Sequence, residues 1–186
     1  MPMPQVRHRF TVDEYHRMAA AGVFHEDDRV ELLDGQVVEM TPIGPEHGSC
    51  VNRLNALFAP LARGAATLSP QNPLVLGAHH EPQPDLALLR YRADGYRTRH
   101  PAPGDALLVV EVGDTSVTKD RQDKIPLYAK SGVPEVWLVD LPADRIEVYR
   151  GPTADGYSEV TTVSRGHTLA PLAFPNLTVP AEEILG

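Results

Sequence analysis

The chain has 186 residues, a net charge of −8 and a single cysteine. One cysteine excludes an internal disulfide, and with no apolar secretory segment near the start it favours a cytoplasmic protein. The negative charge counts against simple, tight nucleic-acid binding, which rests on a basic surface, so such a role would need a local basic patch, a bridging metal or a partner. No apolar stretch reaches the ~18 residues that span a bilayer. The length predicts a single domain over residues 1–186.

The first elements carry clear local signals. Thr11 followed by Glu14 predicts a capping box that opens a short helix over residues 11–22. An Asp-Gly dipeptide between two apolar-rich runs predicts a β-hairpin over residues 29–40. Apolar residues that recur every three or four positions predict a helix over residues 46–63.

The rest of the chain alternates strand-like runs with one helical pattern. The expected strands cover residues 66–76, 84–90, 105–112, 133–141, 145–150 and 157–164, with a helix over 118–132 and a final helical turn over 180–185. Pro126 would either kink the helix or start a second turn, because proline cannot make the interior hydrogen bond. These elements predict an α+β (mixed α/β) domain.

Two acidic residues mark strand ends that can meet. Asp85 opens one strand and Glu111 closes the next, so antiparallel pairing with Asp85 opposite Glu111 brings both carboxylates to one end of the sheet. The same register places Leu89 opposite Leu107. Cβ atoms ~5 Å apart would bring like charges together, an arrangement that calls for a cation. Mg²⁺ prefers such oxygen ligands.

Other polar residues allow two interpretations each. Lys124 shares a helix face with Asp120 and Tyr128, which is either a solvated ion-pair face or a cation aimed at a water or phosphoryl oxygen. Glu31 is either a charge on the solvent side of a strand, or a site residue that ligates a metal or orders the attacking water. His47 falls on the apolar stripe of its helix, which fits a satisfied, half-buried histidine or an accessory site residue.

A rival metal constellation lies in the stretch HHEPQPD. It offers His79, His80, Glu81 and Asp85, and imidazoles with carboxylates suit zinc. Its spacing matches no closed zinc pattern, and adjacent histidines in an extended chain point apart. We therefore favour the paired acids.

The order of these motifs resembles a known family. The set comprises Glu31, His47, Pro84, Asp85, Glu111, Lys124 and Tyr128. The stretches VELLDGQVVEM, PDLALL, LLVVEVGDTS and DRQDKIPLYAKSGVPEVWLVD are similar to those of the Uma-two family of restriction-endonuclease-like proteins, in the PD-(D/E)XK nuclease superfamily. The similarity covers roughly residues 10–185, and the last stretch is the most specific.

This resemblance implies a restriction-endonuclease-like core, a central mixed sheet flanked by helices, and metal-dependent hydrolysis of phosphodiesters. Asp85, Glu111 and the backbone carbonyl of Val112 would hold Mg²⁺ or Mn²⁺. Lys124 would orient or stabilise the nucleophile, and Glu31 would complete the shell.

The chain departs from the superfamily pattern at one position. A lysine usually follows the acid two positions later on the same strand, and here that position is Gly113. The resemblance offers Lys124, on the following helix, as the replacement.

The expected substrate is DNA, and a homodimer would suit the cutting of both strands. Basic residues that could contact a phosphate backbone cluster in one loop: Arg90, Arg92, Arg97, Arg99 and His100. Two alternatives stay open, namely a catalytically quiet interaction module with this fold and a metal-dependent hydrolase of a smaller substrate. The acidic character favours the quiet module, and the complete set of acids and lysine favours the nuclease.

Overall fold

A six-stranded mixed sheet forms the centre of the computed structural model, which describes residues 7–25 and 27–186. The strands in spatial order are β3 (Ala66–Pro70), β4 (Leu86–Arg90), β5 (Ala106–Gly113), β6 (Glu135–Asp140), β7 (Arg145–Thr153) and β8 (Gly156–Ser164). Only β5 and β6 pair in parallel within this sheet, and the other neighbours are antiparallel. This confirms the central mixed sheet that the family resemblance implies.

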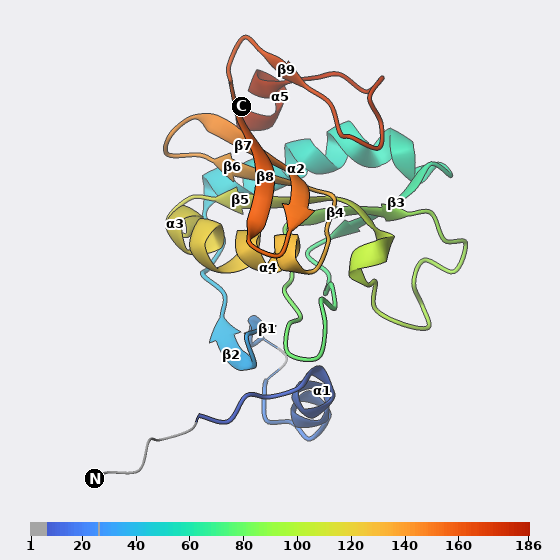
Figure 1. Ribbon diagram of the computed structural model, residues 1–186, viewed down its shortest axis with the longest axis vertical. Coiled ribbons are helices and arrows are strands. Elements are labelled where there is room, and N and C mark those ends of the chain that lie inside the picture. Colours follow the sequence, from blue (N-terminus) through green and yellow to red (C-terminus); the bar gives the residue numbers. More distant parts are fainter. Residues whose placement is uncertain (1–6, 26) are drawn as a thin grey trace.

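Helices cover both faces of the sheet (Figure 1). On one face, α2 (Pro45–Phe58) and α5 (Ala181–Leu185) pack on the larger apolar cluster. On the other face, α4 (Ile125–Lys130), preceded by the single turn α3 (Val117–Lys119), packs on a second cluster. The central strands β4, β5 and β6 are therefore buried on both sides, as their continuous apolar runs indicate, whereas β8 at the edge of the sheet is largely exposed.

Helix α2 confirms the predicted apolar stripe but ends earlier than expected. Its buried side chains are Cys50, Val51, Leu54 and Phe58. Beyond Phe58 the chain tightens into a 3-10 turn over Ala59–Ala62. Pro60 explains the early end, because it has no N–H with which to continue the α-helical ladder.

The register predicted for β4 and β5 is correct next to the predicted site and wrong further along the two strands. Leu86, Ala87 and Leu88 pair with Val110, Val109 and Leu108, the register that sets Asp85 opposite Glu111. A bulge then shifts the pairing, so that Leu89 faces Ala106 and not the predicted Leu107. The extra residue of a bulge changes the register only on its far side.

Two other predictions need correction. The strand expected over residues 66–76 stops at Pro70, since four prolines between positions 70 and 84 remove backbone donors. The helix expected over 118–132 contains a π-helical segment, Asp120–Lys124, directly before α4. Pro126 lies in the first turn of α4 and cannot donate the regular bond, so the chain widens before it.

The N-terminal elements lie at the end of the molecule opposite α5 and the C-terminus (Figure 1). Helix α1 (Val12–Ala20) has the predicted capping box. The hairpin of β1 (Val30–Leu33) and β2 (Gln36–Glu39) turns at the predicted Asp-Gly dipeptide, where both residues have positive φ. A short pair, β9 (Thr168–Leu169) and β10 (Val179–Pro180), precedes α5. Among the described residues, no helix is long and apolar enough to cross a membrane.

Candidate active site

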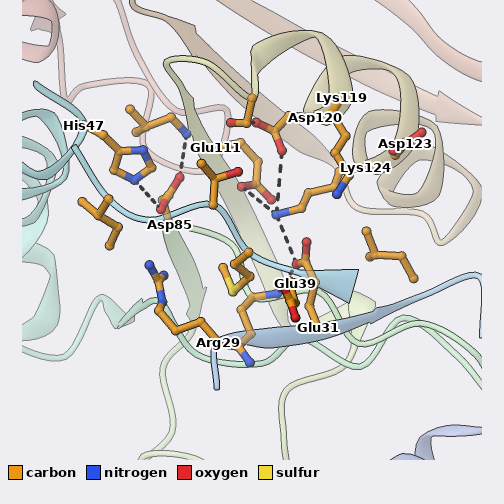
Figure 2. A pocket seen from close by; sticks show the side chains of 17 residues that line it. Arg29, Glu31, Glu39, His47, Asp85, Glu111, Lys119, Asp120, Asp123 and Lys124 are labelled. Carbon is orange, nitrogen blue, oxygen red and sulfur yellow. Dashed lines mark hydrogen bonds and ion pairs between the residues drawn. The ribbon is translucent and has the colours of Figure 1, made fainter. Parts of the chain in front are cut away.

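A small cavity lies where the start of β4 and the end of β5 meet the β1–β2 hairpin (Figure 2). Its volume is about 60 Å³, which leaves room for a few waters or a partly hydrated ion. Side chains reach it from β1, β2, α2, β5 and the turn before α4. Glu31, His47, Asp85, Glu111 and Lys124, all predicted from the sequence, line this one cavity.

Asp85 is fixed from two sides. One carboxylate oxygen, Oδ1, lies 2.8 Å from Nε2 of His47. The other, Oδ2, accepts a hydrogen bond of 2.8 Å from the backbone N–H of Val112. The hydrogen bond to Asp85 raises the pKa of His47, although the partial burial of the ring opposes that shift. His47 is thus an orienting partner of the acid, which explains why its helix carries a histidine on the apolar stripe.

Glu111 is almost fully enclosed. Its side chain accepts a hydrogen bond from the hydroxyl of Tyr128 and another, at 3.3 Å, from Nζ of Lys124. Burial raises the pKa of Glu111 well above its usual range, although Lys124 works against that shift. Tyr128, which the sequence places on the same helix face as Lys124, thus holds Glu111 through its hydroxyl group.

Lys124 is surrounded by carboxylates (Figure 2). Its Nζ lies 3.2 Å from Glu31, 3.3 Å from Glu111 and 3.9 Å from Asp120. Burial by itself would lower the pKa of Lys124, but the carboxylates of Glu111, Glu31 and Asp120 raise it, and the ammonium stays charged at neutral pH. A solvated surface pair is thereby excluded for this lysine, whose exposed fraction is 6%.

Three further acids line the cavity that the sequence did not assign to the site, namely Glu39, Asp120 and Asp123, and of these only Asp120 is buried. Asp120 is 7% exposed, and its carboxylate accepts a hydrogen bond from the Ser116 hydroxyl. Burial raises its pKa. Its position four residues before Lys124 was the available signal. Arg29 and Lys119 also line the cavity and were not singled out, because isolated basic residues have no distinctive pattern.

Charge and ligand chemistry together fit a hard divalent cation. Four buried carboxylates share the cavity: Glu31, Asp85, Glu111 and Asp120. Within the described chain, the basic groups paired with them are Lys124 and His47. Oxygen donors in such excess are what Mg²⁺ and Mn²⁺ prefer over nitrogen- and sulfur-rich sites.

The residues of the rival HHEPQPD constellation point in different directions. Nδ1 of His79 lies 2.8 Å from the carbonyl of Phe10, and Nδ1 of His80 accepts a hydrogen bond from the backbone of Asp34. Of the four residues, only Asp85 lines the cavity. The stretch therefore does not form the single metal site that it could have encoded.

The basic loop lies outside the cavity. Arg90 donates to the carbonyl of Gly104. Arg92 and Arg99 form two-pronged pairs with Asp94 and Asp105, and both guanidinium groups lie over the ring of Tyr96. Arg97 and His100 are exposed. A role for this loop in DNA contact stays a prediction.

The absence of a lysine at position 113 has a steric cause. A Cβ added to Gly113 would lie 2.6 Å from Cβ of Val117, in the first turn after β5. No side chain fits there unless that turn moves. The close approach of α3 to the strand therefore excludes the usual lysine.

Replacing Gly113 with alanine should lower the free energy of unfolding by about 1–3 kcal/mol, the usual cost of overpacking. Gly104→Ala is the matched control, because an added Cβ there has no atom within 4 Å. Urea unfolding of the two variants checks this. Equal stabilities would show that the turn after β5 yields freely and that the steric explanation is wrong.

The comparisons with known proteins agree with this geometry. The family model Uma2, described as "Putative restriction endonuclease", matches residues 12–182. A crystal structure of a putative nuclease belonging to DUF820 from Anabaena variabilis shares the fold, with a TM-score of 0.69, 18% identity, and coverage of 95% of this chain and 97% of that one. No curated protein matches the chain. The family match extends over most of the sequence and includes every acid of the cavity, and the chain belongs to the Uma2 family of restriction-endonuclease-like proteins.

Proposed function

We propose that this protein is an endonuclease that hydrolyses DNA phosphodiester bonds with Mg²⁺ or Mn²⁺. The observation that carries the proposal is the buried group of four carboxylates around one charged lysine, at a water-sized cavity between two strand ends. Membership of the Uma2 family supports a hydrolase of the restriction-endonuclease type. The metal ion and the DNA substrate go beyond what family membership supports, and they are our proposal.

Asp85, Glu111 and the carbonyl of Val112 would hold the metal. The N–H and C=O groups of one strand residue point to the same edge of the strand. Because the N–H of Val112 donates to Asp85, its carbonyl also faces Asp85 and not β6. A bound Mg²⁺ or Mn²⁺ supplies a Lewis acid that polarises a phosphate and lowers the pKa of water.

The protein side chains have separate roles around that position. Lys124 presents a charged ammonium beside Glu111, where it can orient a water and stabilise negative charge that develops on a phosphoryl oxygen. Glu31 is positioned by the backbone N–H of Gln83, at 3.1 Å from its carboxylate, and it contacts the same ammonium. His47 holds Asp85 in place.

Binding of a polyanion to this acidic chain needs local positive charge. Arg29 and Lys119 stand at the cavity wall and are suited to phosphates that flank the scissile bond. The exposed loop around Arg97 would contact a more distant part of the backbone. A homodimer would place a second cavity on the opposite strand of a duplex.

Cleavage of supercoiled plasmid and single-stranded DNA tests the proposal. Wild-type protein should cut with Mg²⁺ or Mn²⁺ and not with EDTA, and Asp85→Asn should abolish cutting because it removes a charged oxygen ligand. Asp155→Asn, at an exposed turn, is the control and should cut normally.

Three outcomes would contradict parts of the proposal. No cutting of any phosphodiester by wild-type protein would indicate the quiet interaction module. Hydrolysis of bis-(p-nitrophenyl) phosphate without cutting of DNA would indicate a smaller substrate. Full activity of Asp85→Asn would show that the site is wrong.

Lys124→Ala should slow DNA cleavage by about 10²–10³-fold, the scale of losing one transition-state stabiliser. Its affinity for Mn²⁺ should not fall, because lysine donates hydrogen bonds and is not the ligand here. Lys130→Ala, an exposed change on the next helix, is the control. Cleavage by Lys124→Ala at the wild-type rate would exclude the lysine from the mechanism.

A further inference from the structure

A second cluster of metal-ligating side chains lies outside the acid cavity. His16 of α1, Glu81 and His100 each offer a ligand atom, and these atoms lie within 4.8 Å of one another. The three residues are far apart in the sequence, and none of them lines the cavity that contains Asp85. The fold alone brings them together.

Glu81 is the unusual member of this cluster. Its side chain is only 4% exposed, and among the described residues both of its carboxylate oxygens have only Nε2 of His16 as hydrogen-bond partner, at 2.7 and 3.0 Å. Burying a carboxylate is costly unless opposite charge compensates it. The His16 ring is 43% exposed, so it is a weak partner for a buried anion.

The backbone holds Glu81 rigidly against the hairpin. Its N–H and C=O exchange hydrogen bonds with Leu32 of β1, at 2.7 and 3.3 Å. The ring of His100 lies with its centroid 5.6 Å from that of His16. One fixed, buried carboxylate thus faces two imidazoles that are accessible to solvent.

We propose that His16, Glu81 and His100 bind a transition-metal ion, with Zn²⁺ as the preferred occupant. Two imidazoles and one carboxylate, with a position left for water, make up a known zinc ligand set. Zinc bonds of about 2.0–2.1 Å to nitrogen would bring the ligand atoms to roughly 3.3 Å apart. Rotation of the two exposed imidazoles can shorten the distances between the ligand atoms from the present values of up to 4.8 Å.

The bound ion would join three segments of the chain. It would link α1, the segment beside β1, and the end of the arginine-containing loop over residues 90–100. A metal that closes such long loops stabilises the folded state by mass action. The site differs in chemistry from the acid cavity, where oxygen ligands favour Mg²⁺.

Titration of tag-free, metal-stripped protein with Zn²⁺ in a calorimeter tests this site. We expect wild-type protein to bind one equivalent of Zn²⁺. His16→Ala and His100→Ala should each weaken this binding by more than about 100-fold, because the loss of an outer-shell partner alone costs about 10–100-fold. His100 is exposed and makes no hydrogen bond to Glu81, so His100→Ala keeps the fold and decides the test if His16→Ala, which removes the partner of a buried carboxylate, fails to fold. Glu111→Gln, in the acid cavity, and His167→Ala, at an exposed position just after a turn, should keep the event.

Three results would contradict the proposed zinc site. No zinc binding by wild-type protein, or unchanged affinity in either histidine variant, would show that His16 and Glu81 form only a hydrogen-bonded pair beside His100. Loss of the event in Glu111→Gln would place the zinc in the acid cavity and would also overturn the proposal. The absence of a zinc site at His16, Glu81 and His100 would not bear on DNA cleavage, which rests on the acid cavity.

Discussion

Excess negative charge in a buried space is the constraint on which the site depends. Like charges that are close together and shielded from water raise each other's pKa, and they stay ionised only when cations and hydrogen-bond donors compensate them. Here the compensation is divided. Lys124 contacts Glu31 and Glu111, while Asp85 relies on His47 and a backbone N–H. The remaining charge is what a divalent ion at this position would neutralise.

Backbone geometry decides where the compensating lysine can stand. The turn after β5 returns so closely over Gly113 that a side chain there would collide with Val117. The π-helical segment before Pro126 then directs both Asp120 and Lys124 into the cavity, where each is more than nine-tenths buried. Widened helical turns of this kind often occur at functional sites. The steric exclusion at Gly113 and the wider helical turn before Pro126 together place the buried ammonium group on the helix and not on the strand.

The sequence predicts the parts of this arrangement that local rules control. Period-two and period-3.6 patterns locate most strands and helices, and the antiparallel pairing that follows from the strand ends brings Asp85 to Glu111. Features that depend on tertiary contact are missed. The β4–β5 bulge, the π-helical segment and the burial of Asp120 leave no periodic signal, and a histidine on α1 that meets Glu81 could not be inferred from spacing. Resemblance to the family suggests the role that we propose for Lys124, and the structure shows why no lysine fits at position 113.

Titration of Mn²⁺ into wild-type protein and Glu111→Gln, followed by calorimetry, tests the central claim most directly. The amide keeps the size of the side chain and its contact with Tyr128 but removes the charge that a hard cation requires. The account predicts that wild-type protein binds Mn²⁺ and that Glu111→Gln does not, whereas Glu159→Gln, on the exposed face of β8, binds like wild type. Equal Mn²⁺ affinity in wild type and Glu111→Gln would contradict the assignment of this cavity as the metal site.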